Sequence, residues 1–150
     1  MFSWFGMVSF VPYTKVHEFA VWLKEGRLMG SVCKGCGLTS FPPRADCPEC
    51  LSEEFAYKEW SGRGQIYSSS TVAAAPTGFE AYAPYRIGLV ELEEGGRLLA
   101  WLGESLPAAE ATVGAPVQVV PRILGESEEL RVVYSIERPG TTWGKSPFAG

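Results

Sequence analysis

The sequence has few of the side chains that enzymes use as acids, bases and nucleophiles. It holds a single histidine, His17, in 150 residues, and its four cysteines all fall within one short stretch, CKGCGLTSFPPRADCPEC. It also lacks the short patterns typical of a hydrolase nucleophile, a phosphate-binding loop or a dinucleotide-binding turn. We therefore expect that this chain does not catalyse group transfer alone.

Charge is also scarce, and basic charge in particular. Charged residues make up 20% of the chain, and the formal net charge is −4. From Trp60 to Arg138 there are six basic residues against ten acidic ones. A general nucleic-acid binder needs a basic surface that neutralises phosphates. We therefore expect no nucleic-acid partner.

Long hydrophobic segments are absent as well. No apolar run approaches the roughly 20 residues that cross a bilayer, so we expect no membrane span. The apolar beginning, MFSWFGMVSFVPY, has neither a basic leading region nor a small-residue cleavage site, which argues against a signal peptide. Paired CxxC cysteines without export are typical of the reducing cytoplasm, where they bind metal. We expect a cytoplasmic protein.

The sequence does contain enough apolar side chains for a core, at 46%, together with 17 glycines and 11 prolines. One amphipathic helix is expected over residues 14–28, with Thr14 as its N-cap and Gly26 near its end. Trp22 falls off the apolar stripe and is a candidate anchor for a partner. The stripe itself has helical spacing and consists of Val16, Phe19, Ala20 and Leu23.

Beyond residue 54 the pattern changes to short strands and turns. The EEGG turn between two apolar strands predicts a hairpin, because glycine accepts the positive φ of tight turns. Five or six strands with one short helical connection fit a small Greek-key barrel of the OB type, with a β-sandwich as the alternative. The predicted strands are residues 55–60, 65–73, 86–92, 97–103, 116–124 and 130–136.

The cysteines form two CxxC pairs, Cys33 with Cys36 and Cys47 with Cys50. Two such pairs place four thiolates around one ion, the usual arrangement of structural zinc. Four protein ligands leave no open position for a catalytic water. A single iron acting as an electron carrier is the alternative, but Leu51 stands where iron sites of this kind usually have glycine, which favours zinc.

These segments together resemble the family known as domain of unknown function 35 (DUF35). The resemblance rests on the four cysteines, the PPR of residues 42–44, the WSGRG of residues 60–64 and the VELEEGGR hairpin. It implies a mainly β protein with an N-terminal helix, a rubredoxin-like zinc ribbon and a C-terminal OB-fold barrel of five to six strands. The chain then divides into a segment with the helix (1–30), the ribbon (31–54), the OB-fold (55–138) and a tail without periodicity (139–150).

The resemblance also implies a function. Such proteins are accessory subunits of acyl-CoA enzymes, so the expected partner is a thiolase-type catalytic subunit that supplies the nucleophile. One enzyme of this kind is the benzoylsuccinyl-CoA thiolase of aromatic degradation. An OB-fold and zinc-ribbon module for single-stranded nucleic acid is the alternative function. The expected cofactor is structural zinc.

Two groups of residues are candidates for contact with acyl-CoA or with the partner. The cations Lys34, Arg44 and Arg63 lie in or beside the cysteine knuckles and the following turn, where they could contact CoA phosphates. The segment of residues 73–86, AAAPTGFEAYAPYR, places three aromatic residues among alanines and prolines. We expect these three to line an interface or a substrate gate, or to plug the barrel. They are Phe79, Tyr82 and Tyr85.

Overall fold

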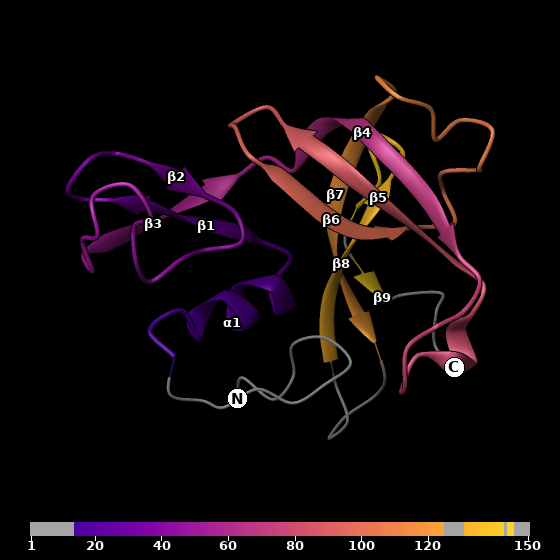
Figure 1. Ribbon diagram of the computed structural model, residues 1–150, viewed down its shortest axis with the longest axis horizontal. Coiled ribbons are helices and arrows are strands. Elements are labelled where there is room, and N and C mark those ends of the chain that lie inside the picture. Colours follow the sequence, from indigo (N-terminus) through magenta and orange to yellow (C-terminus); the bar gives the residue numbers. More distant parts are fainter. Residues whose placement is uncertain (1–13, 125–130, 143, 146–150) are drawn as a thin grey trace.

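The computed structural model describes residues 14–124, 131–142 and 144–145 (Figure 1). It confirms a mainly β fold with one short helix, a zinc-ribbon region and a closed barrel. The ribbon and the barrel lie side by side, with the helix beneath the ribbon (Figure 1). No helix among these residues has the length and apolarity to cross a membrane.

The helix, α1 (Glu18–Lys24), is shorter than the sequence predicted. It does not begin at Thr14, because that hydroxyl accepts a hydrogen bond from the Val16 N–H in a local turn and His17 occupies the N-cap position. It ends as expected at Gly26, whose φ of 82° lets the Arg27 N–H reach back to the Trp22 carbonyl. The predicted helix ran to residue 28, but Leu28 already begins a strand.

Three strands form the sheet of the ribbon, in the order β2–β1–β3, and all pairings are antiparallel. β3 pairs with β1 along its whole length, so it belongs to the ribbon sheet although it leads directly into the barrel. The strands are β1 (Leu28–Cys33), β2 (Thr39–Ser40) and β3 (Phe55–Trp60).

The barrel sheet has the order β4–β5–β6–β8–β7 and closes by pairing of β4 with β7. Closure removes the unpaired edges that an open sheet would present. The hairpin between β5 and β6 is tight because Gly95 and Gly96 both have positive φ. The strands are β4 (Arg63–Val72), β5 (Tyr85–Leu92), β6 (Arg97–Leu102), β7 (Pro116–Leu124) and β8 (Arg131–Glu137).

Two short elements complete the described chain. A 3₁₀ helix, η2 (Glu80–Tyr82), interrupts the long connection between β4 and β5. In the tail, β9 (Gly144–Lys145) pairs in parallel with β7. The tail without periodicity therefore contains one short strand at these two residues. The cause is the edge of β7, which offers backbone partners that sequence periodicity cannot reveal.

One continuous core joins the ribbon, the helix and the barrel. Phe19 of α1 packs edge-on against Phe41 of the ribbon and Tyr134 of β8, with ring centroids 5.8 Å and 6.4 Å apart. Leu23 is completely buried. The same cluster includes Ile66 and Ile136 of the barrel. Because the core is shared, the ribbon is held against the barrel rather than tethered by a linker.

Candidate functional site

The four cysteine sulfurs lie within 4.8 Å of one another. Cys33 Sγ is 3.5 Å from Cys50 Sγ, and Cys36 Sγ is 3.4 Å from Cys47 Sγ. A zinc ion bound at about 2.3 Å by four sulfurs in a tetrahedron requires sulfur separations of about 3.8 Å. The cluster therefore fits one tetrahedral zinc ion and is the structural zinc site predicted from the sequence.

The two knuckles have the same backbone geometry. Gly37 has a φ of 77° and its N–H donates to the Cys33 carbonyl, while Leu51 has a φ of 60° and its N–H donates to the Cys47 carbonyl. The Leu51 side chain is 80% exposed. A left-handed conformation is strained for leucine. The second knuckle therefore adopts the same turn as the first, but without a glycine to relieve the strain of the positive φ.

Backbone amides favour the ionised form of two of these thiols. The pKa of Cys33 is lowered to about 6, chiefly because the Cys36 N–H points at its sulfur and the Gly35 N–H adds to the effect. The pKa of Cys47 is lowered in the same way, first by the N–H of Cys50. Thiolate is the form that binds metal. The backbone of the knuckles is thus arranged for metal binding.

The three cations proposed for CoA are not gathered in one place. Lys34 and Arg44 are exposed on the ribbon, and neither has an ion-pair partner among the described residues. The backbone N–H of Arg44 donates to Ser31 Oγ at 2.9 Å, which fixes the loop that carries it. Arg63 lies at the start of β4, where its Nε is 3.0 Å from Glu93 Oε2. Only the two ribbon cations therefore remain available for an anion.

Trp22 lies between helix and ribbon rather than projecting from the surface. Its ring packs edge-on against Tyr57 of β3, with centroids 4.3 Å apart, and Tyr57 packs in turn against Phe55. The side chain is half-buried. Trp22 thus joins α1 to the ribbon sheet, and its role as a partner anchor stays a prediction.

The three loop aromatics gather around Trp101 of β6. The Tyr85 ring centroid is 4.9 Å from that of Trp101, the Tyr82 centroid 5.5 Å and the Phe79 centroid 6.3 Å. Neighbours of Trp101 on β6, Leu102 among them, are buried in the core, so Trp101 itself faces outward. The three aromatics therefore pack outside the barrel, and the alternative that they plug it is wrong.

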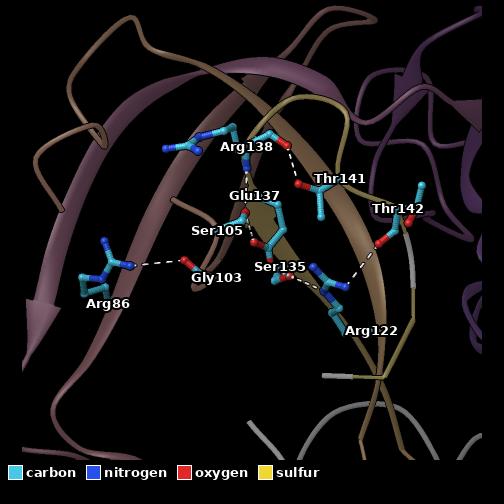
Figure 2. Close-up of polar contacts among 9 residues, drawn as sticks. All are labelled: Arg86, Gly103, Ser105, Arg122, Ser135, Glu137, Arg138, Thr141 and Thr142. Carbon is cyan, nitrogen blue, oxygen red and sulfur yellow. Dashed lines mark hydrogen bonds and ion pairs between the residues drawn. The ribbon is translucent and has the colours of Figure 1, made fainter. Parts of the chain in front are cut away.

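A buried polar network, which the sequence analysis missed, lies where β8 ends. Glu137 is 1% exposed and accepts hydrogen bonds from Ser105 and Ser135, while its carboxylate pairs with Arg122 at 3.0 Å (Figure 2). Arg122 also donates to the carbonyl of Thr142, which ties the tail to β7. The available signal was an acidic residue directly after the buried Ile136, but nothing in the sequence names its partners.

A hollow of about 470 Å³ lies where the ribbon meets the barrel. Its lining includes Glu59, Glu94 and Gln118, and no lysine or arginine of the described part of the chain lines it. Glu94 is held by the backbone N–H and the hydroxyl of Ser61. Trp60 also lines it, and the indole N–H of this buried ring has no partner in the described structure. The acidic lining disfavours phosphate binding here.

Comparison with known proteins now decides the family. Residues 23–56 match the family model described as "ChsH2, rubredoxin-like zinc ribbon domain", and residues 57–122 match "ChsH2, C-terminal OB-fold domain". A DUF35 domain-containing scaffold protein of Methanocaldococcus jannaschii is 38% identical over 107 residues, which cover 71% of this chain and 75% of the relative. The chain belongs to the DUF35 family.

Two further relatives of this DUF35 protein are informative. A solved structure, "Ltp2-ChsH2(DUF35) aldolase", matches with a TM-score of 0.63 and 30% identity, covering 80% of this chain and 91% of the other. The benzoylsuccinyl-CoA thiolase subunit BbsA of Geobacter metallireducens is 37% identical over 75 residues, 50% of this chain and 49% of the relative. The first supports the fold over most of the chain, and the second is a more distant likeness.

Proposed function

We propose that this DUF35 protein is a non-catalytic scaffold subunit of a thiolase-type acyl-CoA enzyme. The observation that carries the proposal is the commitment of all four sulfurs to one metal site, because thiolase chemistry needs a free cysteine nucleophile. The sole histidine, His17, is exposed, and its Nδ1 lies 3.1 Å from the Thr14 carbonyl. Among the described residues no cysteine lies outside this cluster to act as the nucleophile, so we infer that the partner supplies it.

The relatives support this assignment in different ways. The archaeal relatives are named scaffold proteins, one relative is a thiolase subunit, and one similar structure is an aldolase assembly. We infer from them that the partner is an enzyme with a carbon–carbon bond-forming or bond-breaking site. A benzoylsuccinyl-CoA thiolase is one such enzyme. The division into 1–30, 31–54, 55–138 and 139–150 stays a prediction.

The scaffold role fits the way the chain is built. A metal cluster and a shared core hold ribbon and barrel in one fixed relation, so surfaces on both keep their spacing when a partner binds. The unpaired cations Lys34 and Arg44 project from the ribbon. We infer that they contact the phosphates of acyl-CoA bound to the catalytic subunit in the assembled enzyme. Arg63, paired with Glu93, contributes less.

The alternative function, a single-strand-binding module, is less well supported. Aromatic side chains on an OB-fold can stack on bases, but such proteins combine them with a positively charged groove. Here the exposed side chains beside the aromatic loop include Glu80 and Glu104, and Arg86 is held by backbone carbonyls. A cytoplasmic location stays a prediction.

Co-expression with a thiolase-type catalytic subunit tests the proposal. The full chain and the catalytic subunit should co-elute on size exclusion as one complex with a fixed ratio. An engineered chain with Cys36→Ser and Cys50→Ser, which lacks two zinc ligands, is the matched control and should fail to co-elute. Separate elution of the intact chain and the enzyme would refute the proposal.

A further inference from the structure

The outer face of the β5–β6 hairpin is apolar, which is unusual for the exposed side of a barrel. Strand alternation places one set of residues in the core, including the buried Val90 and Leu98, and the other set outside. The outer set is apolar at five positions, with Leu89 directly opposite Leu99 and Ile87 directly opposite Trp101. It ends at the hairpin in the charged pair Glu91 and Arg97. The five apolar positions are Tyr85, Ile87, Leu89, Leu99 and Trp101.

This face is accessible and continues into the aromatic loop. Leu99 at its centre is 59% exposed, and Tyr67 on the adjoining strand β4 is 45% exposed. At one end, Tyr82, Tyr85 and Trp101 line a cleft of about 210 Å³. The strands β4, β5 and β6 run side by side, with the loop at their end (Figure 1). The four other apolar positions of the face are half-buried, so the strip is partly accessible on both sides of Leu99. An apolar strip of this kind on a barrel surface often marks a binding site.

The charges around this face are unevenly accessible. Glu80, Glu91 and Glu104 are exposed, and the last two have no ion-pair partner among the described residues. Arg97 lies over the Tyr67 ring, 3.8 Å from its centroid. Arg86 donates through Nη2 to the carbonyls of Gly103 and Leu106, and its Nη1 is buried. A partner therefore meets exposed carboxylates at the rim of this face. The two nearby cations of the face already have contacts, Arg86 with backbone carbonyls and Arg97 with the Tyr67 ring.

We propose that the catalytic subunit docks on the outer face of β5 and β6, through an apolar side chain that enters the cleft beside Trp101 and basic side chains that face Glu91 and Glu104. The inference rests on the proposed function and adds which surface is used and what chemistry it requires. A cleft of about 210 Å³ accommodates one anchoring side chain, as at the centre of many interfaces.

The charge pattern distinguishes this occupant from others. A second copy of the chain would bring the same carboxylates and a net charge of −4 to the interface, so that like charges would oppose association. Single-stranded nucleic acid would meet an acidic rim as well. A protein surface with basic residues around an apolar centre is complementary to both the rim and the face.

Two single substitutions test the surface, each with a matched control on the ribbon. Leu99→Ser removes an exposed apolar side chain from the centre, and Leu51→Ser removes one that is 80% exposed on the second knuckle. Glu104→Lys reverses a rim charge, and Glu49→Lys makes the same change in net charge on the ribbon. The affinity of each full-length variant for the thiolase-type subunit is measured by calorimetry. Circular dichroism checks that each variant is folded.

We expect Leu99→Ser and Glu104→Lys each to weaken binding at least about tenfold, while the two ribbon variants bind like the wild type. If the wild type binds and only the ribbon variants weaken binding, the docking surface is the ribbon and the inference is wrong. If the wild type does not bind, the proposed function fails and the inference falls with it. A self-associating chain whose dimer is lost in Leu99→Ser would also overturn it.

Hydrogen exchange on the complex gives a second readout that needs no substitution. Amides of residues 79–92 and 97–102 should be protected on binding, while those of β2 and the second knuckle should exchange as in the free chain. Protection confined to the ribbon would contradict the inference.

Discussion

At the scale of single residues, the fold buries the carboxylate of Glu137 and surrounds it with hydrogen-bond donors. Desolvation alone would raise the pKa of Glu137, but hydrogen bonds from Ser105 and Ser135 and the charge of Arg122 outweigh it and lower that pKa. The Glu137 carboxylate lies so close to the backbone after β6 that Gly103 is required there, because a Cβ at this position would fall on the carboxylate. The network joins β8, the connection after β6 and the tail, and so fixes the end of the barrel.

Glu137 should make stability depend on pH in acid. A carboxyl whose pKa is lower when folded stabilises the fold above its ordinary pKa of 4.5, and this contribution is lost as the pH falls through the lowered value. Glu137→Gln should reduce the free energy of unfolding at pH 7 by about 2–4 kcal/mol, since Arg122 loses its partner. Urea unfolding from pH 3 to 7 should show a shallower pH dependence than the wild type. An unchanged pH slope would contradict this account, and the exposed Glu49→Gln is the control.

Replacing Leu51 by glycine should stabilise the protein. Its left-handed backbone is strained, and its exposed side chain contributes little packing. Leu51→Gly should therefore raise the free energy of unfolding by about 0.5–1 kcal/mol, measured by urea unfolding of the zinc-loaded protein. Leu99→Gly, at an exposed strand position with ordinary backbone angles, should instead lower it.

The ribbon cations should act on substrate binding in the assembled enzyme. Arg44→Ala should raise the KM for acyl-CoA of the complex by about tenfold with little change in kcat, because a phosphate contact made in both ground and transition state is lost. Arg63→Ala, which removes a cation already paired with Glu93, is the matched control and should change KM far less. Equal increases in KM for the two variants would contradict a phosphate contact that is specific to Arg44.

At the scale of elements, the local sequence pattern determines where the strands lie, whereas long-range contacts determine how the elements pack. The strands of the barrel lie close to their predicted bounds, because alternation and the glycine turn act within a few residues. The helix start was misplaced because the Thr14 hydroxyl serves a turn rather than a cap. The packing of Phe79 and Tyr82 on Trp101 and the hydrogen bond from Ser105 to Glu137 join residues 19 to 32 positions apart, which periodicity does not encode.

The zinc ribbon should depend on its metal as an element. Elemental analysis should find about one zinc per chain. Chelation should then expose β1 and β3 to hydrogen exchange while amides of β5 stay protected, because the ribbon strands carry the ligands and the barrel has its own apolar interior. Iron in a coloured protein, or a ribbon unchanged without metal, would contradict a structural zinc site.

At the scale of the whole molecule, the chain is a zinc ribbon and a closed barrel joined by one shared core. The family and the zinc site could be predicted from the sequence, because the CxxC spacing and the neighbouring motifs are local and specific. The docking face could not, since it arises only when β5 and β6 pair and the loop folds onto Trp101. The proposed docking face therefore depends on tertiary structure, whereas the metal ligands can be recognised in the sequence.

In the proposed scaffold role, this chain enables a partner's chemistry and performs none itself. The most direct test is the rate of acyl transfer, measured for the thiolase-type subunit alone, for this chain alone and for the two together. We expect acyl transfer only when both are present, or at least about tenfold faster then, and none from this chain by itself. Full activity of the catalytic subunit without the chain, or turnover by the chain alone, would contradict it.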